Sequence, residues 1–290
     1  MASIASLRAQ VAKLRAQATA RMRCGSRETL ERLRADPTLP FTAMGWRPDP
    51  WQARFLTSPG KRESLLCSRQ AGKSTATAAR VVREALLWPK ADCLVFCPTM
   101  RQSMEMLRKV RDFYRALGSP VAELADTKTS LELANGSRVI SLPDSQEGVV
   151  GFSAPRLVVI DEGSRVSDEL YKSVRPMLAV SKGQLLTLST PFGNQGWFFD
   201  IWDDSAEGLK RRAKLHEPWQ RTAVPASQIP RITPEFLEDE RAELGERWFQ
   251  QEYFLRFLDS IDAVFSQAVI HGARSEGIEP LFDLGGVSAA

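Results

Sequence analysis

Short apolar runs alternate with longer stretches of helical spacing through the middle of the chain. Runs of three to five apolar residues predict strands, and apolar residues that recur every three or four positions predict helices. The expected strands lie at 65–67, 93–97, 157–160 and 185–188, and the expected helices lie at 74–87, 102–117 and 168–178. Because these strands are apolar throughout, helices must cover both faces of the sheet. The pattern predicts an α/β fold with a mostly parallel sheet.

Two stretches depart from this alternation. Residues 131–133 and 139–142 flank the pair Asn135-Gly136, which is a strong signal for a β-hairpin. After about residue 215 the pattern becomes helical and rich in aromatic residues. We therefore expect a small helical subdomain packed on the sheet.

The N-terminal segment has a pattern of its own. Apolar residues spaced three or four apart predict an amphipathic helix with a short heptad seam. These residues are Ile4, Leu7, Val11, Leu14 and Ala18. Residues 1–40 hold eight Lys and Arg against three Asp and Glu, a net charge of +5, which leaves −1 for the rest of a chain whose total is +4. A basic arm suits a polyanionic partner, although docking on the chain's own body is the simpler interpretation of the helix.

Composition places the chain among ordinary globular proteins. It has 290 residues, of which 43% are hydrophobic and 26% are charged. No apolar run has the length of a membrane span, and the N-terminus lacks the apolar core of a signal peptide, so we expect a cytoplasmic protein without membrane contact. Four cysteines make no disulfide framework at this size. Cys93 and Cys97 share one face of an expected strand and are interpreted as buried thiols, with a metal site as the alternative.

The strongest chemical signal is the segment 67–75, Cys-Ser-Arg-Gln-Ala-Gly-Lys-Ser-Thr, which follows an expected strand and opens an expected helix. A phosphate-binding loop (P-loop) requires that context. Backbone N–H groups at the helix start would face the phosphates, Gly72 would allow close approach, Lys73 would reach the β and γ oxygens, and Ser74 would ligate Mg²⁺. The segment departs from the usual pattern at its first position, where Cys67 replaces a glycine.

Two acids follow a second apolar strand. Asp161 and Glu162 come directly after residues 157–160, which places them at the carboxyl edge of the sheet, where α/β proteins bind ligands. We expect Asp161 to hold Mg²⁺ and Glu162 to activate the attacking water. A helix-capping turn would also explain two adjacent acids, but the strand context and the position 88 residues after Lys73 favour a partner motif of the P-loop.

Two weaker signals accompany these motifs. Ser189-Thr190 ends another buried strand, where hydroxyl groups could sense the γ-phosphate. Trp51-Gln52 lies just before the P-loop, where an aromatic ring and an amide can grip adenine. Taken alone, the first is explained by a strand-to-turn junction and the second by a core tryptophan beside a surface amide.

Several segments occur in an order typical of one known family. They are Gln52, Arg69–Ser74, Val159–Val166 and Leu188–Gly193, followed by Val224–Ala226, Pro230–Ile232, Glu235–Leu237 and Gln251–Tyr253. Over roughly residues 41–265 the chain resembles the N-terminal ATPase portion of phage terminase large subunits. An Arg-Gln pair in a P-loop without its first glycine is common in that family, so Cys67 agrees with the resemblance.

The resemblance implies a RecA-like P-loop ATPase of the ASCE class, in which the catalytic glutamate follows the magnesium-binding aspartate. It implies that Gln52 recognises adenine and that Arg69 contacts the γ-phosphate. It also implies that Ser189 and Thr190 couple hydrolysis to subdomain motion. The expected site comprises Gln52, Arg69, Gln70, Ala71, Gly72, Lys73, Ser74 and Thr75 for ATP, Ser74 and Asp161 for Mg²⁺, and Glu162, Lys73 and Arg69 for catalysis.

The same resemblance implies a set of partners. They are ATP with Mg²⁺, double-stranded DNA, a portal ring, a small DNA-recognition subunit and further copies of the chain, in a ring on the procapsid or as a monomer in solution. The expected division is a basic helical arm at 1–40, the ATPase core at 41–215, a helical lid or linker at 216–265 and a tail at 266–290. Terminase large subunits usually continue into a ribonuclease-H-like nuclease, whose metal sites need several converging carboxylates. The tail is too short to build one, so we expect no nuclease domain here.

The expected function is therefore ATP-driven translocation of double-stranded DNA into a procapsid. One alternative is a helicase-type translocase, which would need a second RecA-like domain that the pattern of 215–290 does not predict. Another is a nucleotide-gated switch or DNA-binding adaptor, which would not need the water-activating Glu162.

One residue expected from the family is missing. Terminases tend to carry an arginine followed by glycine just before the Asp-Glu strand, and ring ATPases commonly use such a residue to stabilise the transition state in a neighbouring subunit. Val150-Gly151 occupies that place. Arg156 and Arg165 flank the strand and are the available substitutes, with Arg156 preferred because it lies on the same side as the missing residue. An ordinary surface position would also explain both arginines.

Overall fold

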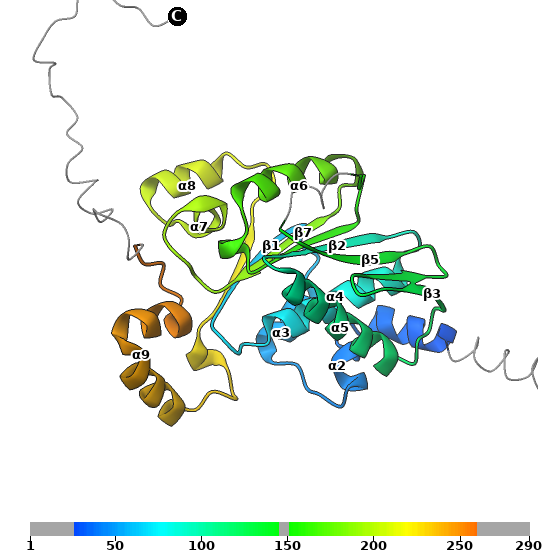
Figure 1. Ribbon diagram of the computed structural model, residues 1–290, viewed down its shortest axis with the longest axis horizontal. Coiled ribbons are helices and arrows are strands. Elements are labelled where there is room, and N and C mark those ends of the chain that lie inside the picture. Colours follow the sequence, from blue (N-terminus) through cyan, green and yellow to red (C-terminus); the bar gives the residue numbers. More distant parts are fainter. Residues whose placement is uncertain (1–25, 145–150, 260–290) are drawn as a thin grey trace, which may run out of the picture.

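An eight-stranded sheet forms the centre of the computed structural model, which describes residues 26–144 and 151–259 (Figure 1). The strands are β1 (Arg62–Cys67), β2 (Asp92–Cys97), β3 (Glu123–Asp126), β4 (Ser130–Leu133), β5 (Arg138–Pro143), β6 (Leu157–Asp161), β7 (Gln184–Ser189) and β8 (Gln220–Val224). Their order across the sheet is β3-β4-β5-β2-β6-β7-β1-β8. The strands from β5 to β8 in this order pair in parallel, and β4 is antiparallel to β3 and β5. The mostly parallel sheet and the hairpin at Asn135-Gly136 are confirmed.

Helices cover both faces of this sheet, as the apolar strands required. They are α2 (Leu39–Ala43), α3 (Pro50–Thr57), α4 (Lys73–Leu87), α5 (Met100–Ala116), α6 (Asp168–Ser181), α7 (Gly196–Trp202), α8 (Ala206–Ala213) and α9 (Pro234–Phe254). In Figure 1, α2 to α5 lie on one side of the sheet and α6 to α8 on the other. The result is a RecA-like α/β fold.

Strand β2 shows why the strands are apolar at every position. Cys93, Val95 and Cys97 are buried in the core that includes α4 and α5, whereas Leu94 and Phe96 are buried on the opposite face with α6 and α7. Both cysteines are fully buried free thiols, and burial raises the pKa of each. Within 26–144 and 151–259 no group of three or more His, Cys, Asp or Glu side chains could hold a metal ion. The interpretation as buried thiols is confirmed.

Strand β8 lies in the stretch where the sequence pattern indicated only helices. Its residues Gln220 to Val224 include three polar side chains and are mostly exposed, yet all five pair in parallel with β1. An edge strand needs to bury only part of its surface, and hydrophobic periodicity therefore does not reveal it. The expectation of a purely helical segment after residue 215 was wrong at this point.

The helical subdomain consists mainly of α9, which stands apart from the sheet in Figure 1. Phe249 and Tyr253 pack with Ala226 into a small core of their own. Gly245, with φ 76° and ψ 158°, interrupts the helical geometry and kinks α9. The proposed boundaries at 40, 215 and 265 remain predictions.

At the N-terminus the structure describes only part of the predicted arm. Residues 26–35 are helical, while the amphipathic pattern at 4–18 and the tail at 266–290 lie outside the described residues. None of the described helices combines the length and apolar character needed to cross a membrane.

Candidate active site

The segment between β1 and α4 has the conformation of a phosphate-binding loop. Gly72 adopts φ 83° just before α4 begins at Lys73. A Cβ atom at Gly72 would lie 2.7 Å from Nε2 of Gln52, which donates a 3.4 Å hydrogen bond to the Gly72 carbonyl. Glycine is therefore required here by both backbone conformation and space. The first N–H groups of the 15-residue helix α4 lie at this point without acceptors inside the helix. Such a helix start favours bound anions.

Lys73 of the P-loop meets Glu162 at the end of β6. The Lys73 Nζ atom lies 3.0 Å from Oε1 of Glu162, and the two side chains are only 12% and 21% exposed. Burial alone would lower the pKa of Lys73, but the carboxylates of Glu162 and Asp161 raise it above its ordinary value. The lysine is therefore charged and is held beside the carboxylate that we expect to activate water.

Ser74 and Asp161 form the second contact between the two motifs. The Ser74 hydroxyl donates a 3.1 Å hydrogen bond to Oδ2 of Asp161, and the Glu162 N–H donates to Oδ1 at 3.0 Å. Burial, together with the neighbouring charge of Glu162, raises the pKa of Asp161 to about 6. A hydroxyl and a carboxylate are the hard oxygen ligands that suit Mg²⁺, and sites for this ion usually take their remaining ligands from water and substrate phosphates.

The backbone of Glu162 separates the two adjacent carboxylates. Glu162 lies in the left-handed region at φ 52° and ψ 46°, a conformation that is costly for a residue with a side chain. After this turn Asp161 contacts Ser74, whereas Glu162 contacts Lys73. Asp161 can therefore hold a cation beside Ser74 while Glu162 remains able to accept a proton.

Ser189 and Thr190, at the end of β7, are tied to the turn that follows Glu162. The Ser189 Oγ lies 2.6 Å from the Oγ of Ser164 and donates to Oε2 of Glu162 at 3.4 Å. The Ser164 hydroxyl also donates to the carbonyl of Thr190 at 2.8 Å. The end of β7 is thus linked to the carboxylate of Glu162 through hydroxyl groups. Ser164, which lay in the family segment Val159–Val166 without an expected role, is a member of this link.

Arg69 is bound to α9 rather than directed at the place where we expect the γ-phosphate. Its Nε donates a 2.6 Å hydrogen bond to Oε2 of Glu252, and its backbone N–H donates to the Glu252 carbonyl at 3.1 Å. The hydrogen bond to Glu252 raises the pKa of Arg69 above its ordinary value. The expected phosphate contact of Arg69 remains a prediction, and it would require this pair to separate.

Gln52 has both ends of its amide engaged in the protein. Oε1 accepts a 2.8 Å hydrogen bond from the N–H of Asp49, while Nε2 reaches the Gly72 carbonyl. Asp49 in turn forms two 2.8 Å contacts with Arg231, which lies near the carbonyl of Ala71. Gln52 thus braces the P-loop from α3, and its contact with adenine remains a prediction.

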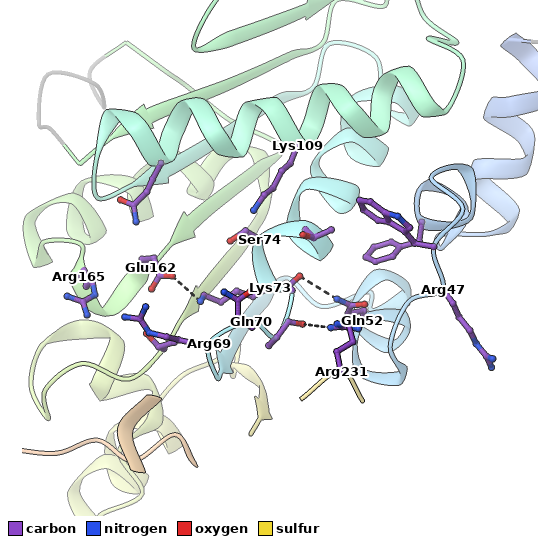
Figure 2. A pocket seen from close by; sticks show the side chains of 17 residues that line it. Arg47, Gln52, Arg69, Gln70, Lys73, Ser74, Lys109, Glu162, Arg165 and Arg231 are labelled. Carbon is purple, nitrogen blue, oxygen red and sulfur yellow. Dashed lines mark hydrogen bonds and ion pairs between the residues drawn. The ribbon is translucent and has the colours of Figure 1, made fainter. Parts of the chain in front are cut away.

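These side chains line one pocket of about 740 Å³. Of the expected residues it contains Gln52, Arg69, Gln70, Ala71, Gly72, Lys73, Ser74, Thr75, Glu162, Arg165 and Thr190, and it adds Phe41, Trp46, Arg47, Gln102, Lys109 and Arg231. In Figure 2 Lys109 points from α5 towards Ser74, whereas the side chain of Arg47 points away from the loop. The added residues are scattered along the chain, and only Arg231 lay in a segment that carried the family resemblance.

The charge of this pocket suits a polyphosphate. Among the lining residues, Arg47, Arg69, Lys73, Lys109, Arg165 and Arg231 are basic, and Glu162 is the one acid. Clefts lined by one sign of charge concentrate ligands of the opposite sign.

The two candidate substitutes for the missing arginine lie in different places. Arg165 lines the pocket and stacks on Phe192 with 4.0 Å between guanidinium and ring centre. Arg156 precedes β6, so it lies at the opposite end of that strand from Asp161; its Nε donates a 2.9 Å hydrogen bond to Glu84, and its guanidinium stacks on Trp88. A role of either arginine in a neighbouring subunit remains a prediction. Val150, the place of the missing arginine, lies outside the described residues.

Comparison with known families identifies the class of protein. A family model described as "Terminase large subunit, T4likevirus-type, N-terminal" matches residues 64–270. The chain belongs to this family. A search of curated protein sequences finds no match to this terminase chain.

Solved terminase structures share the fold. The large terminase ATPase domain of Thermus phage P74-26 is 21% identical over 75% of this chain and 97% of that domain, with a TM-score of 0.63. The large terminase of a second thermophilic bacteriophage is 12% identical over 73% of this chain and 54% of its own, with a TM-score of 0.60. The HK97 bacteriophage large terminase is 17% identical over 78% and 54%, also with a TM-score of 0.60. This chain therefore spans about half the length of the latter two proteins.

Proposed function

We propose that this terminase chain hydrolyses ATP and uses the energy to move double-stranded DNA into a viral procapsid. The observation that carries the proposal is the convergence of two pairs, Lys73 with Glu162 and Ser74 with Asp161, beside the P-loop. The large terminase of the second thermophilic bacteriophage has been solved with ADP and with ATP-γ-S, which supports a nucleotide as the ligand of this pocket.

Each residue has a role that follows from its position. Lys73 and the N–H groups at the start of α4 bind the β and γ phosphate oxygens. Ser74 and Asp161 would hold Mg²⁺, which neutralises phosphate charge when bound. Glu162 accepts a proton from water as the water oxygen bonds to the γ-phosphorus and the bond between that phosphorus and the β–γ bridging oxygen breaks. ADP and inorganic phosphate are the products.

The Lys73–Glu162 pair makes proton acceptance depend on the substrate. While the two side chains lie 3.0 Å apart, the carboxylate of Glu162 is bound to an ammonium group. Phosphate oxygens compete for Lys73, and their binding frees the carboxylate to accept a hydrogen bond from water. Ser189, the last residue of β7, contacts Glu162, so a shift of this carboxylate on nucleotide binding would change a contact of β7.

Transfer of this chemistry to DNA requires partners. We propose a ring of copies of this chain bound to a portal ring on the procapsid, supplied with DNA by a small terminase subunit. Arg156 or Arg165 of a neighbouring copy would supply the trans-acting arginine. In the infected host this machinery would work in the cytoplasm.

DNA-stimulated ATP turnover by the purified chain tests the proposal. A packaging ATPase should hydrolyse ATP faster when duplex DNA is present but should not separate its strands. Strand separation coupled to hydrolysis would favour the helicase alternative. ATP binding without turnover, both in the presence and in the absence of DNA and procapsids bearing portal, would favour the nucleotide-gated adaptor.

A further inference from the structure

Six basic side chains gather around a groove of about 880 Å³ at the edge of the sheet that faces away from the P-loop. They are Lys61, Arg62, Lys172, Arg175, Lys182 and Lys214. They come from the start of β1, from α6 and its C-cap, and from the C-cap of α8. Segments far apart in the sequence therefore bring these cations together.

Little negative charge balances this basic groove. Glu217 is the one acid among the lining residues, and it lies 3.7 Å from Lys61 and 3.5 Å from Arg62. Lys172, Lys182 and Lys214 are exposed and have no ion-pair partner in the part of the chain that the structure describes. With histidine neutral, the lining residues carry five more positive than negative charges.

Such an arrangement is unusual for a merely solvated surface. Like charges held in one groove repel one another, and ordinary protein surfaces intersperse both signs. Other exposed arginines of the described residues show that interspersion, since Arg108 pairs with Glu105 and Asp112, and Arg211 pairs with Asp200 and Asp203. The basic groove therefore has the charge pattern of a binding site for a polyanion.

From this geometry we propose that the basic groove binds the phosphate backbone of duplex DNA. The inference builds on the proposed function, because duplex DNA is the polyanion that a packaging ATPase must hold. Flexible lysine ammonium groups suit contacts that carry no sequence information, since each acts as a point charge on whichever phosphate lies nearest. Contact without sequence preference is what a motor needs when it moves along arbitrary DNA.

Two strands connect the basic groove with the nucleotide pocket. Arg62 begins β1, which ends at Cys67 and leads into the P-loop. Gly183, another lining residue, precedes β7, which ends at Ser189 beside Glu162. DNA held at one end of these strands thus acts on the elements that carry the catalytic groups at the other end. The basic groove is accordingly expected to mediate stimulation of ATP turnover by DNA.

The test is binding of a short fluorescein-labelled duplex, followed by fluorescence anisotropy at several salt concentrations. The variant Lys172→Gln with Lys214→Gln removes two charges from the basic groove. The control variant, Arg54→Gln with Lys90→Gln, removes two charges from exposed positions elsewhere. Both variants should unfold at the wild-type temperature, because all four side chains are exposed.

The groove variant should bind the duplex roughly tenfold or more weakly near physiological salt, and the slope of log K against log salt should fall by about 2. The control should change neither quantity by as much. Basal ATP turnover should be unchanged in both variants, and the groove variant alone should lose its stimulation by DNA.

Equal duplex affinity and salt slope in the groove variant and the wild type would overturn the inference, and an acidic protein surface would then be the better occupant. An equal loss in both variants would also overturn it, because the effect would then reflect overall charge. The binding assay does not depend on hydrolysis. A wild-type chain that bound DNA through the groove without hydrolysing ATP would therefore contradict the proposed function and leave this inference standing.

Discussion

Arg69 and Glu252, 183 positions apart in the sequence, join the P-loop to the last helix through a 2.6 Å ion pair. The carboxylate of Glu252 is only 3% exposed, whereas the guanidinium side chain of Arg69 is 58% exposed. The guanidinium of Arg69 is therefore accessible to an incoming phosphate, while the carboxylate that holds it is buried. If a phosphate of the nucleotide binds Arg69 in place of Glu252, the ion pair between α9 and the P-loop breaks when the nucleotide binds.

Glu252→Gln should tighten ATP binding. The neutral amide holds Arg69 less firmly than the carboxylate does, because hydrogen bonds between charged groups are roughly twice as strong as neutral ones. We expect the Kd for ATP to fall by roughly three- to tenfold, a difference of about 1 kcal/mol. Glu238→Gln, at an exposed position of the same helix, is the control. An unchanged Kd in Glu252→Gln, measured by titration calorimetry, would show that Arg69 does not reach the nucleotide.

Glu162→Gln should separate binding from hydrolysis. The amide cannot accept a proton from water, so turnover should fall by a factor on the order of 10² or more, while the P-loop contacts to ATP remain. Lys73→Ala should instead weaken ATP binding itself. Parallel measurement of ATP affinity and phosphate release distinguishes the two, and wild-type turnover in Glu162→Gln would refute the assignment of this residue.

Arg156→Ala distinguishes a local structural role from a role in a neighbouring subunit. Its loss leaves the buried carboxylate of Glu84 with Arg83 as its remaining partner, at 3.4 Å, so unfolding free energy should fall by about 1–3 kcal/mol. A trans role predicts in addition that Arg156→Ala and Lys73→Ala chains, each inactive alone, recover partial ATPase activity when mixed. Full activity of Arg156→Ala under assembling conditions would leave only the structural role.

The stability of the fold should depend on a buried ion pair between α4 and β1. Arg80 is 1% exposed, and its guanidinium lies 2.9 Å from Glu63 of β1. Arg80→Met should lower the unfolding free energy by about 3–5 kcal/mol near neutral pH, because it leaves the carboxylate of Glu63 buried and unpaired. Replacing both residues, as Arg80→Met with Glu63→Leu, should restore part of that loss in urea denaturation.

The pH dependence of the Arg80→Met defect has a definite sign. Burial already raises the pKa of Glu63 above its unfolded value, and removal of Arg80 raises it further. A carboxyl group with a raised pKa in the folded state costs stability above that pKa and costs none below both values. The destabilisation should therefore shrink as the pH falls through the pKa of Glu63, whereas a pure packing defect would persist.

Local patterns in the sequence predicted the sheet and the centre of the site. The apolar strands β1, β2, β6 and β7 lie where the runs of apolar residues placed them, since their sequence must satisfy two buried faces. The P-loop and the Asp161-Glu162 pair meet because both follow parallel strands and therefore reach the same edge of the sheet.

The remaining features depend on distant contacts that no local pattern contains. The left-handed turn at Glu162, the pair between Arg69 and Glu252, and the brace between Asp49 and Arg231 each join or orient residues through the completed fold. Arg156 was preferred because of its place in the sequence, yet a strand carries its two ends to opposite edges of the sheet. The distance of Arg156 from the Asp161 of its own chain could not be predicted from that place in the sequence, and its role in a neighbouring subunit remains a prediction.

The position of β8 beside β1 limits how far the chain can be truncated from its C-terminus. A chain ending at residue 215 would keep the P-loop, Asp161 and Glu162, but it would lack Gln220–Val224 and so expose the backbone N–H and C=O groups of β1 along one side. It would also lose the hydrogen bond from the Ser68 N–H to the Val224 carbonyl. Unpaired strand edges recruit other chains, so the truncated protein should aggregate through the strand that carries its P-loop.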